Sequence, residues 1–277
     1  MDIFIDGPAG KIDVRHKNLE AGRPLVILCQ GANLSGQLGY DFQFDGRSDH
    51  SMMDALVARG FAVVTFAVRG YRKSGLSHDP LDVGTEQAIE DLTAVFDWAK
   101  DQGFAQPHLL GWSWGGRIVG HFAARHPERV GRLVLMDAAL GGGNTIPFTE
   151  DSPWWLNTYD YFFNKLEDEF TELAAREALA RQAEDGELKA PNGIRVENER
   201  GSVQVDATAL RNPTLMLYGH AAAKQDYMQG GAVREDFFRK LPLEDKALVI
   251  VPGGGDYAHL QHPRQRIFTV IADFLTV

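Results

Sequence analysis

The chain has 277 residues, with 28 basic and 38 acidic side chains and a formal net charge of −10. A net negative charge that is spread over the chain argues against a nucleic-acid-binding surface and against a polybasic membrane contact. The hydrophobic (44%) and charged (24%) fractions exclude a disordered, collagen-like or coiled-coil chain. The length predicts either about two domains or one large α/β domain with an insertion.

Three further features bear on the compartment. Cys29 is the single cysteine, which excludes an intrachain disulfide and a cysteine-rich zinc site. The longest apolar run, Phe61–Val68, is too short to span a bilayer. The first residues, Met1–Asp6, lack the basic stretch and apolar core of a signal peptide. We therefore expect a soluble, cytoplasmic protein without membrane or nucleic-acid partners, and the sequence leaves its oligomeric state open.

Short β-rich runs alternate with segments of helical periodicity, a pattern typical of a parallel sheet with helices on both faces. Continuous apolar runs favour strands that are buried on both faces. We predict a doubly wound sheet of about eight, mostly parallel strands. Its recognisable strands are Ile12–His16, Leu25–Leu28, Phe61–Val68, His108–Leu110, Leu133–Met136, Thr214–Tyr218 and Ala247–Val251.

Three helices belong to this alternating pattern. Thr85 is predicted to cap the first, which Gly103 ends. The second is expected from about Ser113 to Arg125, before a proline. The third is expected from about Pro263 to Leu275.

One stretch interrupts the alternation. About 70 residues separate Gly143, after the strand that ends at Met136, from Asn212, where the next strand signal begins, and this is too many for a structureless loop. A charged helix is expected from Lys165 to Ala183, and 186–205 looks irregular or hairpin-like. We predict an inserted, largely helical lid at 144–211 between two parts of the core, 1–143 and 212–277.

The segment Leu109–Gly116 contains the pattern G-x-S-x-G around Ser113. With 29 glycines in the chain the bare pattern is only moderately specific. Its context strengthens it, because it follows an apolar strand and opens a helix, as a nucleophile elbow does. Small residues at positions −2 and +2 allow the sharp turn that exposes the serine hydroxyl. The pattern therefore predicts Ser113 as a nucleophile.

A serine hydroxyl is a weak nucleophile at neutral pH and needs a base. The last predicted strand ends in a glycine-rich loop that carries His259 just before the final helix. His259 is the candidate base. The third group must be a carboxylate that orients the imidazole, and the segment Gly219–Asp226 after the preceding strand contains Asp226 as a candidate.

Taken together, these motifs resemble those of the α/β-hydrolase-fold serine hydrolases, over essentially the whole chain apart from the lid. In that family the acid usually lies three residues after the equivalent of Gly219, where this chain has Ala222. The distance to the following helix favours Asp226 as the acid. Asp137 is the alternative, because some members carry the acid at the end of the strand that precedes the insertion.

Two further stretches match the family. Leu28–Asn33 resembles its oxyanion loop, with Gln30 in place of the usual histidine. The backbone N–H groups of Ala32 and Trp114 would then form the oxyanion hole, and Asn33 either adds a side-chain contact to substrate or stabilises the loop. The segment 67–75 resembles a structural loop in which Arg69 is a scaffold residue.

Aromatic residues are dense around the nucleophile and early in the lid. Such a cluster forms either the core of the lid or a closed apolar pocket that favours a hydrophobic or aromatic substrate. The candidate substrate-binding side chains besides Asn33 are Trp112, Trp154, Trp155, Tyr159, Phe162 and Phe163.

These residues predict a hydrolase without cofactor or metal that cleaves an ester or lactone bond through an acyl-enzyme on Ser113. Carbon–carbon bond or thioester hydrolysis uses the same parts. The missing carboxylate at Ala222 keeps open a ligand-binding, receptor-like protein with little turnover.

Overall fold

The computed structural model describes residues 1–276 except 143–146, 149–151 and 223–229. Its main sheet has eight strands in the order β1-β2-β4-β3-β5-β6-β9-β10. The strands are β1 (Asp2–Gly7), β2 (Gly10–Lys17), β3 (Leu25–Cys29), β4 (Ala62–Phe66), β5 (His108–Trp112), β6 (Leu133–Met136), β9 (Thr214–Gly219) and β10 (Lys246–Val251).

The predicted sheet is confirmed, and each predicted strand overlaps an observed one. Strands β4, β3, β5, β6, β9 and β10 run parallel, and β1 and β2 are antiparallel at one edge. The sequence analysis missed β1. Only Ile5 of that strand is buried, and Phe4 is 53% exposed, so the apolar signal of a central strand is absent there.

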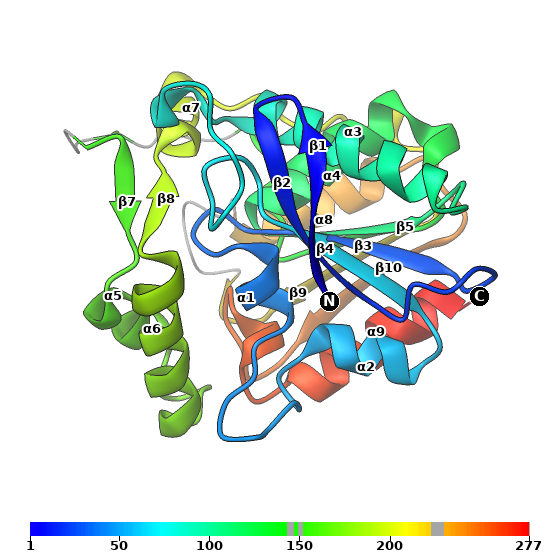
Figure 1. The fold of residues 1–277 in the computed structure, drawn as a ribbon. Helices are drawn as coiled ribbons and strands as arrows, with labels where there is room; N and C mark the ends of the chain where they lie inside the picture. The colour runs from blue at the N-terminus through cyan, green and yellow to red at the C-terminus, as the bar shows by residue number, and fades with distance from the viewer. Residues whose placement is uncertain (143–146, 149–151, 223–229, 277) are drawn as a thin grey trace.

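Helices cover both faces of the sheet, as Figure 1 shows, with α2 and α9 on one side and α3 and α4 on the other. Each face has its own apolar core, which the alternating side chains of the central strands supply. The helices outside the insertion are α1 (Gly36–Tyr40), α2 (Met52–Ala58), α3 (Thr85–Asp101), α4 (Trp114–Arg125), α8 (Gly230–Lys240) and α9 (Arg264–Thr276).

The prediction that Thr85 caps α3 is wrong by one residue, because Gly84 is the N-cap and Thr85 is the first helical residue. The Thr85 hydroxyl is engaged elsewhere. It donates a hydrogen bond to the Glu197 carboxylate (2.7 Å) and accepts one from Trp114 Nε1 (3.0 Å). Thr85 therefore joins three segments instead of capping its own helix.

The described residues between β6 and β9 contribute no strand to the main sheet, and most of them lie beside it (Figure 1). We call residues 152–211 the insert. Its elements are β7 (Trp154–Leu156), α5 (Tyr159–Lys165), α6 (Leu173–Glu187), β8 (Lys189–Pro191), α7 (Gly193–Arg200) and the 3₁₀ turn η3 (Ala207–Ala209).

Two expectations for this region are corrected. The helix predicted from Lys165 to Ala183 is observed as α6 and begins later, at Leu173; residues 166–172 are not helical, and α5, which ends at Lys165, precedes the predicted range. The stretch expected to be irregular or hairpin-like holds α7, and its strand β8 pairs with β7, which lies far upstream. Such long-range pairing leaves no local signal in the sequence. The domain boundaries at 143 and 211 stay predictions.

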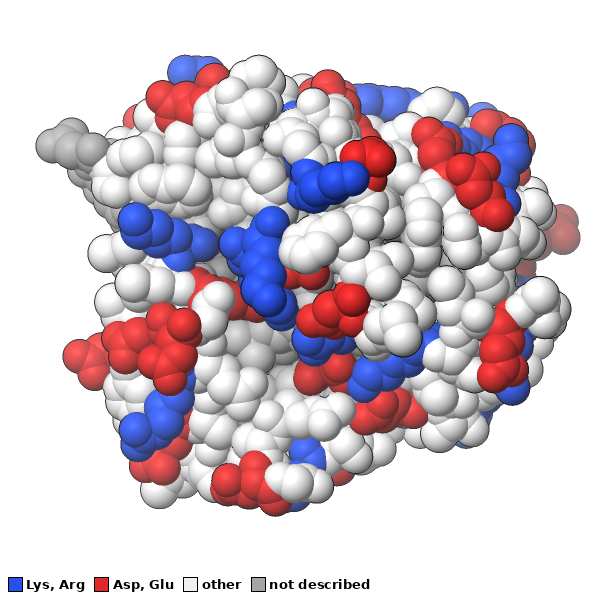
Figure 2. All heavy atoms as spheres, viewed as in Figure 1, with Lys and Arg blue, Asp and Glu red and all other residues white. Residues whose placement is uncertain are grey.

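Charged side chains of both signs are interspersed over the face shown in Figure 2. This mixing agrees with the expectation that the net charge of −10 is diffuse. No helix of the described residues has the length and apolarity needed to cross a membrane.

Arg69 forms a buried ion pair, as expected for a scaffold residue. It is 3% exposed and contacts the fully buried Asp91 carboxylate at 2.8 Å. Removing one partner leaves an uncompensated buried charge, so Arg69→Met is expected to lower the free energy of unfolding by about 3–5 kcal/mol. Urea denaturation measures this.

The control for that prediction is Arg125→Met, which removes an exposed ion pair with Glu86. Exposed pairs contribute about 0.2–1 kcal/mol, so this change is expected to be small. Equal losses in the two variants would contradict the scaffold role of Arg69.

Candidate active site

The turn between β5 and α4, where a nucleophile elbow is predicted, has a strained backbone at Ser113. Ser113 has φ 53° and ψ −118°, a backbone conformation that non-glycine residues rarely adopt. A Cβ on Gly111 would lie 2.2 Å from the Gly115 carbonyl oxygen, and a Cβ on Gly115 would lie 2.3 Å from that of Cys29. The two glycines of the motif are therefore a steric requirement of this turn.

The same close approach places the start of α4 against the predicted oxyanion loop. Gly115 lies directly against the carbonyl groups of Cys29 and Gln30, at the end of β3. The loop that carries Ala32 and the helix start that carries Trp114 are thus neighbours. Their N–H groups as an oxyanion hole stay a prediction, and the short distance between the two segments supports it.

The insert holds the oxyanion loop through Asn33. The Asn33 amide donates to the Tyr161 hydroxyl (2.6 Å) and accepts from Arg195 (2.9 Å), while its backbone oxygen accepts from Asn157 (2.6 Å). Both ends of the side chain are used by these contacts. Of the two roles considered for Asn33, the structure therefore favours stabilisation of the loop.

A second link between insert and loop was missed by the sequence analysis. The Glu187 carboxylate, at the end of α6, accepts hydrogen bonds from the backbone N–H (2.7 Å) and the hydroxyl of Ser35. Burial raises the pKa of the Glu187 carboxyl. A signal was present in the sequence, because Glu187 continues the buried stripe of Leu179 and Ala183 at four-residue spacing.

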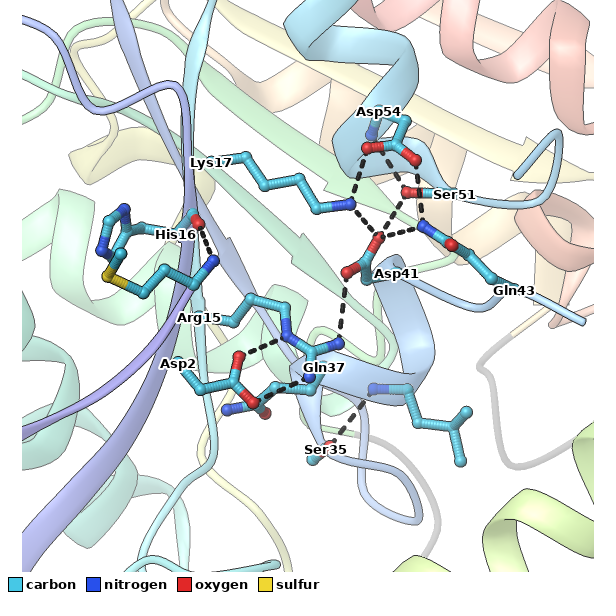
Figure 3. A network of polar contacts seen from close by, with 12 residues as sticks. Asp2, Arg15, His16, Lys17, Ser35, Gln37, Asp41, Gln43, Ser51 and Asp54 are labelled. Carbon is cyan, nitrogen blue, oxygen red and sulfur yellow. Dashed lines mark hydrogen bonds and ion pairs between the residues drawn. The ribbon is translucent and has the colours of Figure 1, made fainter. Parts of the chain in front are cut away.

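The helix α1 follows the predicted oxyanion loop, and the polar network of Figure 3 holds both of its ends. Ser35 caps α1 by accepting from the Leu38 N–H. Just after the helix, the Asp41 carboxylate accepts from Arg15 (3.1 Å) and Lys17 (2.5 Å), which both lie on β2. These contacts tie α1 to the main sheet.

His259 lies in the 3₁₀ turn η6 (Ala258–Leu260) and is fully buried. Its ring centroid is 4.5 Å from that of Trp112 and 5.9 Å from that of Tyr40. The backbone of Gly39 also interacts with the imidazole, although neither ring nitrogen meets the geometry of a hydrogen bond. Burial lowers the pKa of His259 to about 3.

This shift predicts a dependence of stability on pH. Because the folded state favours the neutral ring, the unfolded chain binds one proton more between about pH 6.5 and 3. The free energy of unfolding is therefore expected to fall as the pH is lowered through this window, by up to about 1.4 kcal/mol per pH unit for this group. Urea titrations of the wild type and of His259→Asn test it, and an identical pH dependence of the two would contradict it.

Asp137 follows β6 directly and is fully buried, with φ 43°. Its Oδ1 accepts a hydrogen bond from the Gly219 N–H at the end of β9 (2.8 Å), and its Oδ2 has no hydrogen-bond partner among the described residues. Burial raises the pKa of the carboxyl well above its usual range. The other candidate acid, Asp226, lies outside the described residues.

Ser113, Asp137 and His259 follow the carboxyl ends of β5, β6 and β10, strands of one parallel sheet. The carboxyl ends of parallel strands lie at the same edge, which is where such sheets place their sites. The topology thus brings the three candidate groups to one edge. No hydrogen bond joins the three side chains in the described structure.

Two of the predicted substrate-binding aromatics, Trp112 and Phe162, are buried. Trp112 is 2% exposed, packs against His259 and donates from Nε1 to the Asp256 carbonyl (2.7 Å). Phe162 is fully buried in the apolar core on the α2–α9 side of the sheet. Both side chains are enclosed by the packing around them and do not line an open surface.

The other four aromatics, which belong to the insert, are partly exposed and contact arginine or lysine side chains. Arg195 lies 4.0 Å from the ring centre of Trp155, and Arg176 lies 4.3 Å from that of Phe163. Trp154 and Tyr159 have similar cationic neighbours. Cation–π contacts of this kind stabilise the insert, and a substrate role for these side chains stays a prediction.

One described cluster has the residue types of a metal site. Asp49, His50 and Glu172 bring potential ligand atoms within 4.8 Å of one another. The two carboxylates, however, are already paired with Arg47 and Arg264 at 2.5–3.0 Å. The arginines supply the positive charge that a cation would bring, so the cluster fits an ion-pair network better than a metal.

Comparison with known proteins identifies the family. Residues 24–189, more than half of the chain, match the family model of the alpha/beta hydrolase fold. The chain therefore belongs to the α/β-hydrolase family, and the resemblance inferred from the motifs is confirmed.

Two curated relatives are named 2-hydroxy-6-oxononadienedioate/2-hydroxy-6-oxononatrienedioate hydrolases. That of Pseudomonas putida is 27% identical over 49% of this chain and 44% of its own length. That of Paraburkholderia phymatum is 25% identical over 62% of each chain. This chain therefore aligns with less than two thirds of either relative.

A solved structure of a hydrolase from Pseudomonas aeruginosa superimposes with a TM-score of 0.72 at 16% identity, covering 100% of this chain and 98% of that one. At this level of identity the likeness shows the fold.

Proposed function

We propose that this protein is a serine hydrolase that cleaves an ester or lactone bond of a hydrophobic or aromatic small molecule. The observation that carries the proposal is the strained elbow of Ser113 between β5 and α4. Strain of this kind costs about 1–3 kcal/mol and persists at sites where the side chain has a function. The conformation projects the serine hydroxyl at the sheet edge that also carries His259 and Asp137.

The reaction follows from these groups. Ser113 Oγ attacks the carbonyl carbon while His259 takes the hydroxyl proton. The oxyanion that forms accepts hydrogen bonds from the N–H groups of Ala32 and Trp114. Collapse expels the alcohol, which receives the proton from His259. A water molecule, deprotonated by the same imidazole, then releases the acid and restores Ser113.

We assign Asp137 as the carboxylate that orients His259. Its support is the combination of complete burial, a position at the end of β6 and an Oδ2 that makes no hydrogen bond in the described structure. A buried carboxylate oxygen without a partner is costly, and pairing with a protonated His259 in the transition state would offset that cost.

A second candidate, hydrolysis of a carbon–carbon bond, is favoured by the names of the relatives from Pseudomonas putida and Paraburkholderia phymatum. Hydrolysis of a carbon–carbon bond would use Ser113 and His259 in the same roles, and it differs from ester hydrolysis in the leaving group, which is a carbon. The substrate therefore decides between the two proposals.

The experiment is a steady-state panel with p-nitrophenyl esters of acetate and phenylacetate, five- and six-membered lactones, and a 2-hydroxy-6-oxo-dienoate. We expect kcat/KM for the phenylacetyl ester to exceed that for the acetyl ester by about tenfold or more, since an apolar pocket gains from added apolar area. Faster turnover of the dienoate than of every ester and lactone would establish the second candidate. Absence of turnover on the whole panel would contradict both.

A further inference from the structure

The loop between β10 and α9, residues 252–263, carries His259 and is bonded to the insert. Gln261 links the two and is fully buried. Its Oε1 accepts a hydrogen bond from the Gly255 N–H (2.8 Å), and its Nε2 donates one to Glu167 Oε2 (2.7 Å). Both ends of the amide are therefore used, one by the loop itself and one by the insert.

Packing at Gly255 reinforces this link. A Cβ at that position would lie 2.5 Å from Glu167 Oε1, so the carboxylate lies directly against the loop backbone. Beyond His259, the His262 N–H donates to the carbonyl of Phe170 (2.8 Å). The stretch of the insert between α5 and α6 thus contacts the loop both before and after the histidine.

These contacts matter because, within the part of the chain that the structure describes, neither ring nitrogen of His259 has a hydrogen-bond partner that would hold the ring. The imidazole is kept in place by packing on Trp112 and Tyr40 and by the backbone of its loop. A shift of the loop would carry the ring with it. Reaction rates are sensitive to displacements of about 1 Å in a catalytic group.

We propose that Glu167, acting through Gln261, is a positioning residue for His259. This inference rests on the proposed function, in which His259 is the base. In this arrangement the insert influences the reactivity of Ser113 through the position of His259. Glu167 contacts neither the imidazole nor the serine in the described structure and takes no part in the chemistry.

The test measures the rate at which a fluorophosphonate labels Ser113 in the full-length protein. In this reaction Ser113 Oγ displaces fluoride from phosphorus and His259 takes the hydroxyl proton, so the rate reports the base directly. The binding constant and the maximal labelling rate are obtained separately from the dependence on probe concentration. The melting temperature of every variant is measured alongside.

Four variants separate positioning from general damage. Glu167→Ala removes the acceptor, and Gln261→Glu places two carboxylates face to face, so both are expected to lower the maximal labelling rate by about tenfold or more. Glu167→Gln keeps an acceptor oxygen and is expected to label like the wild type. Asp168→Ala, which removes an exposed neighbouring carboxylate, is the matched control.

The double variant Glu167→Gln/Gln261→Glu completes the cycle. It reverses the direction of the central hydrogen bond and keeps an acceptor for the Gly255 N–H, so it is expected to recover most of the rate lost in Gln261→Glu. Wild-type rates in Glu167→Ala and Gln261→Glu, or no recovery in the double variant, would overturn the inference. A wild-type protein that is not labelled at Ser113 would overturn the proposed function, and the inference with it.

Discussion

Replacing Ser113 by alanine is expected to lower kcat for the best ester substrate by about 10⁴-fold or more, to the level left by binding and the oxyanion hole alone. The hydroxyl is the atom that attacks the carbonyl, and no neighbouring side chain on the turn between β5 and α4 can replace it. Steady-state kinetics on the purified variant measure the loss. An unchanged kcat would contradict the assignment of the nucleophile.

The control for this variant is Ser113→Gly. The positive φ of 53° is strained for any residue with a Cβ and is accessible to glycine. Ser113→Gly is therefore expected to be as inactive as the alanine variant and more stable than the wild type by about 1 kcal/mol. Activity and stability would then change in opposite directions, as expected where the fold stores strain for catalysis.

Replacing Asp137 by asparagine is the second large expected effect. An amide cannot stabilise the imidazolium form of His259, so kcat is expected to fall by about 10⁴-fold, by analogy with other serine triads. The hydrogen bond from the Gly219 N–H can be kept by the amide oxygen. Because burial disfavours the charged carboxylate, the free energy of unfolding is expected to stay the same or to rise.

Asp226→Asn is the matched variant for this prediction. If Asp137 is the acid, Asp226→Asn retains kcat within a few-fold of the wild type. The reverse result, in which Asp226→Asn is inactive and Asp137→Asn is active, would establish the residue that family spacing favours. The two single variants therefore decide between the candidates.

The central strands could be predicted from sequence because each is a short apolar run with a clear boundary. β6 is observed with the predicted bounds, Leu133–Met136, and β9 and β10 differ by one residue. The edge strand β1 and the paired strands β7 and β8 could not be predicted. β1 pairs with the adjacent strand β2 but buries only Ile5, and β7 pairs with β8, which is distant in sequence, so these strands leave no local apolar pattern.

The residues of the candidate site also differ in how far the sequence predicts them. Ser113 and His259 were predictable because a glycine-flanked turn and a loop after the last strand leave local signals in the sequence. The roles of Asn33, Glu187 and Gln261 depend on contacts with segments up to 162 residues away. In the sequence Asn33 and Gln261 resemble surface side chains, whereas the four-residue spacing of Glu187 from Ala183 and Leu179 places it on the buried face of its helix.

For Asp137 the sequence supplies part of the argument and the structure supplies the rest. The sequence offered it as an alternative on the basis of its place at the end of an apolar strand. The structure adds its complete burial, its bond to Gly219 and its Oδ2 without a hydrogen-bond partner. None of these three properties can be read from the residues around position 137, because they depend on β9 and on the packing around the end of β6.

The central claim is that His259 activates Ser113 as a nucleophile. The most direct measurement is the intact mass of the protein after exposure to a fluorophosphonate, followed by peptide mapping of the adduct. We predict one adduct per chain on Ser113, absent in Ser113→Ala and formed more slowly in His259→Ala. An unmodified wild-type protein, or a Ser113→Ala variant labelled as fully as the wild type, would contradict the claim.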